Sequence, residues 1–150
     1  MSRQRAEVED VRPIVAAHEV GHLIAFQLAD MTITEVRLVG SRIRAEGYVQ
    51  IEDADQPHDA AQAHAVLVGV LAGVAAGHRW CDRHGLTHLV GEDVHDRAAW
   101  LDLRPKPLFR DVDRRQALAD ARRLVRQHWS RIERLAPVLA ERGFLPPDAS

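Results

Sequence analysis

The sequence predicts a mainly α fold with one small β-hairpin, formed by a single domain over residues 1–150. In most of the chain, apolar residues recur at steps of three and four, which is the spacing of one helix face. β-Branched residues gather in one segment, Ile33 to Ile51, which indicates the hairpin. The length of 150 residues suffices for one core but leaves no room for a second full domain.

The first helix is expected from Val11 to Leu28, with Asp10 as its cap and Pro13 tolerated in its first turn. One face of this helix carries residues at helical spacing, namely Ile14, His18, Gly21, His22, Ala25 and Leu28. The hairpin follows over Ile33 to Ile51. The stretch from Glu52 to Asp59 is polar and contains a proline, so we expect a loop there.

A second helix is expected from about His58 to Trp80. It carries Gly69, Gly73 and Gly77 at four-residue intervals, a composition that is poor for helicity on its own. Because such a stripe lets another helix approach closely, we place this helix at the domain centre, with the first helix as a candidate neighbour. Its most apolar run, Ala65 to Gly77, is shorter than the roughly 20 residues that a membrane span needs, and predicts a buried core helix.

The rest of the chain is expected to be helical with short breaks. An irregular link from Cys81 to Val90 leads to a third helix over about Glu92 to Leu103. The segment from Asp113 to Arg142 predicts a helical hairpin or a kinked helix. A capping pattern formed by Ser130 and Glu133 favours a break just before it.

Charge and cysteine content argue against several classes of function. The formal net charge of -2 gives no overall field that would favour nucleic acid or an anionic membrane. A run of arginines is interleaved with aspartates and is expected to form a solvated face; it comprises Arg114, Arg115, Arg122, Arg123 and Arg126. The single Cys81 cannot form an internal disulfide, and the residues after Met1 lack the apolar core of a signal peptide, so we expect a cytoplasmic protein.

The first helix contains a complete H-E-x-x-H motif, from His18 to His22. Two histidines four residues apart project from one helix face and can present their ring nitrogens to one metal ion, with zinc as the expected cofactor. Glu19 lies one step along, where it can reach a water on the metal rather than the metal itself, which suits a general base. The motif therefore predicts a zinc-hydrolase site with His18 and His22 as metal ligands.

A site of this kind needs a third protein ligand and an open position for water. The extended motif H-E-x-x-H-x-x-G-x-x-H fails here, because Ala25 and Leu28 stand where it has Gly and His. The third ligand must come from further along the chain. The acidic residues and the histidine in the segment from Gly91 to Asp96 are the candidates.

These segments together resemble the protease domain of the FtsH-type ATP-dependent zinc proteases, without the ATPase module. The family's H-E-A-G-H-A helix is similar to the chain from His18 to Leu23, and a Gly-Tyr pair closing its hairpin is matched by Gly47-Tyr48. Its L-G-G-R-A-A-E helix resembles Val68 to Ala76, but the Arg and the Glu are missing, with Val74 and Gly77 nearby instead. The resemblance covers nearly the whole chain and implies a helical zinc endopeptidase that binds extended substrate beside a short strand, here within Ile33 to Ile51.

The family's third zinc ligand is an Asp that follows a Gly at the start of the next helix, and both Asp93 and Asp96 fit that place. With Asp96 as ligand, the residues on its helix face are Ala99, Trp100 and Leu103, which suit the core. We therefore favour Asp96 and expect Asp93 to be a surface or helix-capping residue. His95 is an alternative, either as a hydrogen-bond partner of a ligand or as a substitute ligand.

The leading hypothesis is a zinc-dependent metallopeptidase that hydrolyses peptide bonds with a zinc-activated water. The chain contains no G-x-x-x-x-G-K-[ST] phosphate loop, so its expected substrate is a peptide or unfolded protein, with a separate ATPase as a possible partner. We expect no nucleic acid and no membrane span, and oligomerisation stays open. One alternative is a non-catalytic, zinc-containing module that binds a peptide or protein. The other is a structural helical domain with a chance motif.

Overall fold

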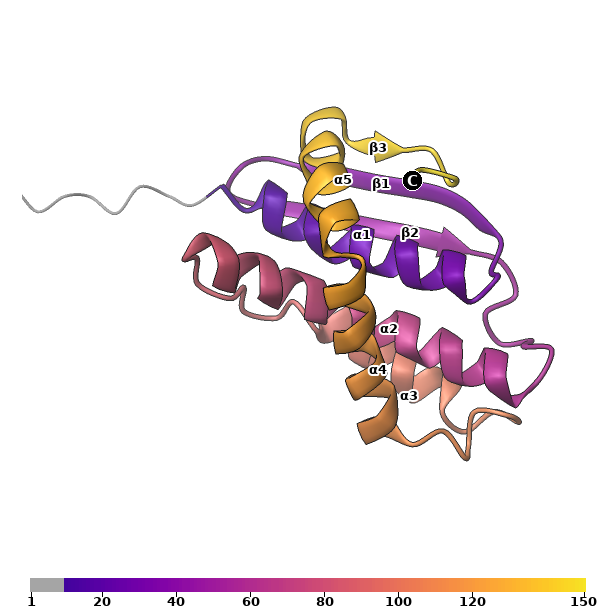
Figure 1. Ribbon diagram of the computed structural model, residues 1–150. Coiled ribbons are helices and arrows are strands. Elements are labelled where there is room, and N and C mark those ends of the chain that lie inside the picture. The colour runs from indigo at the N-terminus through magenta and orange to yellow at the C-terminus, as the bar shows by residue number, and fades with distance from the viewer. Residues whose placement is uncertain (1–9) are drawn as a thin grey trace, which may run out of the picture.

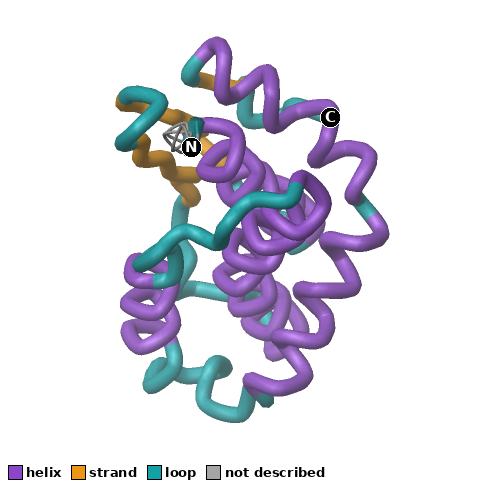
Figure 2. Tube along the Cα trace, turned by 90° about the vertical axis from the view of Figure 1, so that its left-hand side faces the viewer, coloured by secondary structure: helices purple, strands orange, loops and turns teal. Residues whose placement is uncertain are grey.

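The computed structural model describes residues 10–150, and its mainly helical fold confirms the expected class. Its elements, in chain order, are α1 (Arg12–Leu28), β1 (Ile33–Gly40), β2 (Ala45–Ile51), α2 (Ala60–His84), α3 (Val94–Leu103), α4 (Arg114–Gln127), α5 (Trp129–Arg142) and β3 (Phe144–Leu145). Figure 1 shows α1 between the strands and α2. Helix α5 packs across α1, and α4 packs across α2. The strands lie together at one end of the molecule and helices form the rest (Figure 2).

The three strands form an antiparallel sheet in the order β2-β1-β3. The hairpin of β1 and β2 agrees with the prediction from the sequence. The short third strand was not predicted: it follows α5 and pairs Leu145 with Val36 and Phe144 with Arg37. Because β3 occupies the far side of β1, strand β2 forms one edge of the sheet.

Helix α1 is the central element of the core, and it is buried along most of its length. Its apolar side chains, among them Ile14, Leu23 and Ile24, are fully buried and pack with α5 and the sheet. Each Å² of apolar surface that is buried stabilises the fold by about 25 cal/mol. Burial on several faces therefore fixes the position of the helix. The motif carried by α1 is therefore held on a rigid support.

The glycines of α1 and α2 allow these two helices to pack closely, as the spacing in α2 predicted. A Cβ atom added to Gly21 would lie 2.6 Å from the Cβ atom of Ala76 and 2.7 Å from the carbonyl oxygen of Ala72. A Cβ atom added to Gly69 would collide with the ring of Phe26. The expected neighbour of α2 is thus confirmed to be α1.

The boundaries of α2 differ from the prediction. The helix continues past Trp80 to His84 and ends at Gly85, which has a left-handed φ of 65°. Cys81 lies within α2 and is buried in the core, so the prediction that the irregular link begins there was wrong. Helix α2 is long and apolar enough to cross a membrane, since an 18-residue window of it has a mean hydropathy of 1.6. However, 56% of that window is buried inside the fold, as expected of a core helix.

The predicted caps were also partly wrong. The cap position of α1 is Val11, whose side chain makes no capping hydrogen bond, although Asp10 accepts a hydrogen bond from the backbone N–H of Arg12 at 3.1 Å. The break between α4 and α5 exists, but no capping pair forms there. Glu133 instead accepts a hydrogen bond from the indole N–H of Trp129 at 2.6 Å.

Candidate metal centre

Helix α1 buries the three polar residues of its motif. His18, Glu19 and His22 are each 6–7% exposed, and they are the only polar or charged residues between positions 10 and 150 that are buried as whole residues. Burying such groups without partners is costly. Gly69 on α2, Glu92 just before α3 and Asp96 on α3 supply partners for the two histidines. Glu19 packs against Gly47 of β2.

Each histidine is held through its Nδ1 atom. His22 Nδ1 lies 2.8 Å from the carbonyl oxygen of Gly69 on α2. His18 Nδ1 lies 2.9 Å from Oε1 of Glu92, which precedes α3. A carbonyl oxygen and a carboxylate only accept hydrogen bonds, so Nδ1 carries the hydrogen in both rings. In its neutral form each ring therefore exposes an Nε2 lone pair.

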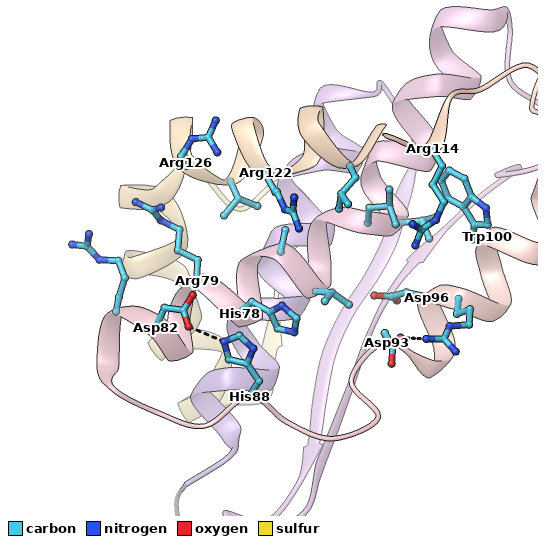
Figure 3. A pocket seen from close by; sticks show the side chains of 18 of the residues that line it. His78, Arg79, Asp82, His88, Asp93, Asp96, Trp100, Arg114, Arg122 and Arg126 are labelled. Atoms are coloured by element: carbon cyan, nitrogen blue, oxygen red, sulfur yellow. Dashed lines mark hydrogen bonds and ion pairs between the residues drawn. The ribbon is translucent and has the colours of Figure 1, made fainter. Parts of the chain in front are cut away.

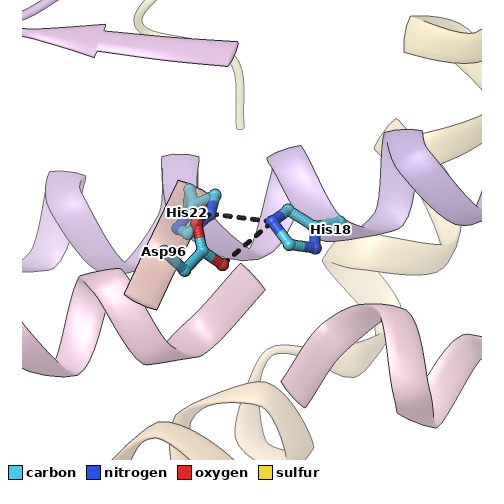
Figure 4. Close-up of side chains that lie close together, drawn as sticks. All are labelled: His18, His22 and Asp96. Atoms are coloured by element: carbon cyan, nitrogen blue, oxygen red, sulfur yellow. Dashed lines mark hydrogen bonds and ion pairs between the residues drawn. The ribbon is translucent and has the colours of Figure 1, made fainter. Parts of the chain in front are cut away.

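These two lone pairs point towards one another and towards a carboxylate (Figure 4). The Nε2 atoms of His18 and His22 are 3.0 Å apart. Asp96 on α3 places Oδ1 3.1 Å from Nε2 of His22 and Oδ2 3.1 Å from Nε2 of His18. The Oδ2 atom is buried and lacks hydrogen-bonding geometry. Two ring nitrogens and one carboxylate thus converge on one point. When the rings are neutral, all three accept hydrogen bonds and none of them donates one.

This arrangement fits a metal ion. Ligand atoms bound to zinc at 2.0–2.1 Å in tetrahedral geometry are about 3.3 Å from one another. The two Nε2 atoms are 3.0 Å apart, and each lies 3.1 Å from a different oxygen of Asp96. One ligand atom from each of the three residues can be chosen so that all lie within 4.8 Å of one another. Two imidazoles and one carboxylate leave one tetrahedral position open, as catalytic zinc sites require. His18, His22 and Asp96 could therefore hold a metal ion together.

The structure distinguishes between the candidate third ligands. It brings Asp96 to the histidine pair, whereas Asp93 pairs with Arg97 at 2.5 Å and is about half exposed. His95 is exposed, and the hydrogen-bonding role considered for it belongs to Glu92. Glu92 lies in the acidic segment from which the third ligand was sought. Nothing in its spacing distinguished it as the partner of His18.

Charges within the cluster shift the pKa values of its members. Burial disfavours the protonated form of His18, but Asp96 and Glu92 outweigh it and raise the pKa of this ring to about 10. For His22, burial is likewise outweighed by Asp96, and its pKa is raised. Burial acts to raise the pKa of Asp96, but the two rings outweigh it and lower that pKa. Without a metal ion, the raised pKa values favour protonated histidine rings, and these supply the positive charge that the carboxylates of Asp96 and Glu92 attract.

Glu19 lies beside this cluster, one residue after His18 on α1. Burial raises the pKa of its carboxyl group above the usual value. Within residues 10–150 the carboxylate has no hydrogen-bond or ion-pair partner. A Cβ atom added to Gly47 of β2 would lie 2.6 Å from Cγ of Glu19, so the side chain packs directly under the edge strand. Glu19 can therefore take up a proton near the proposed metal position.

Two glycines of α2 make room for the cluster. A Cβ atom on Gly73 would overlap the imidazole of His22 and lie 2.7 Å from Nε2 of His18. A Cβ atom on Gly77 would overlap Oε1 of Glu92. The glycine spacing predicted a close approach of helices, but its contribution to the site was not apparent from the sequence.

No protein-family model matches this chain, and no curated protein matches it in sequence. Conclusions about its function therefore rest on the geometry of its own residues.

Proposed function

We propose that this chain is a zinc-dependent metallopeptidase of the FtsH-like type. His18, His22 and Asp96 would hold the zinc ion, and Glu19 would act as the general base. The observation that carries the proposal is the convergence of two Nε2 lone pairs and a buried carboxylate beside a carboxyl group that has no other partner. A structural domain has no need of such an arrangement, since each polar group buried in it adds a desolvation cost.

The chemistry divides between the metal and the chain. Zinc in such a site supplies a Lewis acid that acidifies water and polarises a carbonyl group. Glu19 would accept a proton from the water as its oxygen bonds to the peptide carbon. The carboxyl group would then give that proton to the amide nitrogen as the C–N bond breaks, which leaves a carboxylic acid and an amine. The raised pKa of Glu19 suits a group that both takes and returns a proton.

Strand β2 supports the choice of an extended peptide as substrate. It is an edge strand, and its Gly47 lies against Glu19. A peptide that pairs with this strand gains backbone hydrogen bonds with little dependence on its side chains. Its scissile bond would lie near the base, which favours peptides or unfolded protein segments as substrates.

The test is zinc analysis of the purified chain, together with cleavage of an unfolded casein-like protein. The wild type is expected to bind one equivalent of zinc and to cleave the substrate. His22→Ala should lose both properties, because it removes one ligand. His58→Ala, which alters an exposed histidine of the loop before α2, is the matched control and should keep both.

Each other outcome is informative. Zinc binding with peptide binding but no cleavage would replace the enzyme with a non-catalytic binding module. A metal-replete preparation that holds no zinc would contradict both proposals and leave a structural domain.

A further inference from the structure

A second candidate binding site is a groove of about 900 Å³ between α2, α3 and α4 (Figure 3). Its size lies in the range of ligand-binding pockets. Its apolar lining comes from all three helices and includes Val70, Leu71, Val74, Leu101, Leu118 and Val125. Its charged lining is mostly arginine. The groove therefore combines an apolar floor with a cationic rim.

The acidic residues of the groove already have partners. Asp82 pairs with His88 at 2.7 Å, and Asp93 pairs with Arg97 at 2.5 Å. Asp96 lies at the two histidines of the candidate metal centre. The carboxylates within the groove are thus committed to neighbours.

Four arginines in the groove have no carboxylate partner within residues 10–150, namely Arg79, Arg114, Arg122 and Arg126. The guanidinium of Arg79 lies over the ring of Trp129, and that of Arg114 lies over the ring of Trp100. The Nε atom of Arg79 is buried without a hydrogen-bond partner. Figure 3 shows Arg122 reaching from α4 towards α2. A ligand with several negative charges would complement this rim.

The arginines are spread along the groove and do not surround one point. On α4, Arg114 and Arg126 are twelve residues apart, which corresponds to about 18 Å along the helix. A single carboxylate or phosphate cannot reach both ends of such a row. A chain that carries several anionic groups can. Between the cations lie Leu118 and Val125, which favour apolar groups at intervals along the same chain.

An oligonucleotide fits these features less well than a peptide. Bases bind single-strand sites largely by stacking on aromatic faces. The tryptophan of this groove, Trp100, already has the guanidinium groups of Arg104 and Arg114 at its ring. The two imidazoles of the groove, His78 and His88, stack on each other with ring centroids 4.1 Å apart. The remaining floor is aliphatic and suits leucine-like side chains.

We propose that this groove binds an acidic amphipathic peptide segment of a partner protein. The segment lays its apolar face on the floor and its carboxylates along the arginines of α4. Asp96 contributes to the wall of the groove, and α3 buries only Trp100 and Leu103 of its ten residues. The bound segment therefore contacts the least anchored helix, the one that carries the proposed third ligand. The inference does not depend on hydrolase activity.

The test uses the full chain and a fluorescent peptide of about 14 residues, roughly 21 Å as a helix, with glutamates and leucines on opposite faces. We expect saturable binding by fluorescence anisotropy. The double variant Arg122→Glu/Arg126→Glu should weaken binding at least about tenfold, because both residues are exposed and face the groove. The matched control is Arg115→Glu/Arg123→Glu, which makes the same charge change on α4 outside the groove and should bind as the wild type does.

Three further probes address the alternatives. A peptide with serines in place of the leucines should lose binding, and a lysine-leucine peptide should not bind. Equal weakening in the two double variants, or tighter binding of a single-stranded oligonucleotide, would overturn the proposal. A third outcome would also overturn it: the chain binds no peptide but self-associates in sedimentation, and Arg122→Glu/Arg126→Glu abolishes that self-association. A second copy of the chain would then occupy the groove.

Discussion

At the scale of single residues, the candidate metal centre depends on the hydrogen-bond partner of each histidine's Nδ1 atom. The Gly69 carbonyl oxygen and the Glu92 carboxylate fix which nitrogen carries the hydrogen, and therefore which nitrogen is free to bind a metal ion. Glu92 reaches His18 from 74 positions away in the sequence. Its carboxylate occupies the space that a side chain at position 77 would need.

This arrangement makes Gly77 and Glu92 interdependent. Gly77→Ala should weaken zinc binding about 10- to 100-fold, because the added methyl group displaces the carboxylate that orients His18. Glu92→Ala should weaken it by a similar factor. In the double variant, Gly77→Ala should add little to the effect of Glu92→Ala, since the group it displaces is already gone. Competition titrations with a chromophoric zinc chelator measure all four affinities, and fully additive effects would contradict the account.

Protons and zinc compete for the same ring nitrogens. Both histidines have raised pKa values in the metal-free protein, that of His18 at about 10, whereas a metal ligand must be neutral. Zinc binding at pH 7 is therefore expected to release protons, that of His18 among them, and the affinity should rise as the pH increases towards 10. Calorimetry in buffers of different ionisation enthalpy counts the protons. A heat of binding that is the same in all buffers would show that the rings are not the ligands.

At the scale of the elements, the packing of α1 on α2 determines where the motif lies. Most of this level was predictable, because helical spacing, the hairpin and the glycine stripe are all patterns within short segments. Features that depend on distant contacts were not predictable. Strand β3 has only two residues and forms by pairing with β1, and α2 extends past Trp80 because Cys81 is buried in the core. Glu92 becomes a partner of His18 only when α3 packs on α2 and brings the residue before it to α1.

The close approach of the two helices predicts a specific stability effect at Gly21. Gly21→Ala should lower the free energy of unfolding by about 1–3 kcal/mol, although alanine favours helices, because its Cβ atom would meet Ala76 and the Ala72 carbonyl. Adding Ala76→Gly removes one of the two obstructions. The double variant should therefore lose less free energy of unfolding than the two single variants lose together. Urea denaturation provides these values, and an unchanged or raised stability in Gly21→Ala would refute the packing described.

At the scale of the whole molecule, three segments distant in sequence meet at one point. Helix α1 supplies two proposed ligands and the base, α3 supplies the third ligand, and β2 covers the base with a glycine. The H-E-x-x-H motif indicated the first three residues directly. The preference for Asp96 over Asp93 followed from the helix face it shares with Trp100, and the structure places Asp96 at the histidines. Activity itself remains the central proposal.

The most direct measurement of that proposal is the rate of zinc-dependent peptide cleavage by Glu19→Gln at equal zinc content. This change keeps the size of the side chain but removes the group that accepts the proton. The rate is predicted to fall at least about 100-fold while zinc remains bound, and Glu141→Gln, the same change at an exposed position on α5, should cleave as the wild type does. A Glu19→Gln chain that binds zinc and cleaves at the wild-type rate would contradict the account.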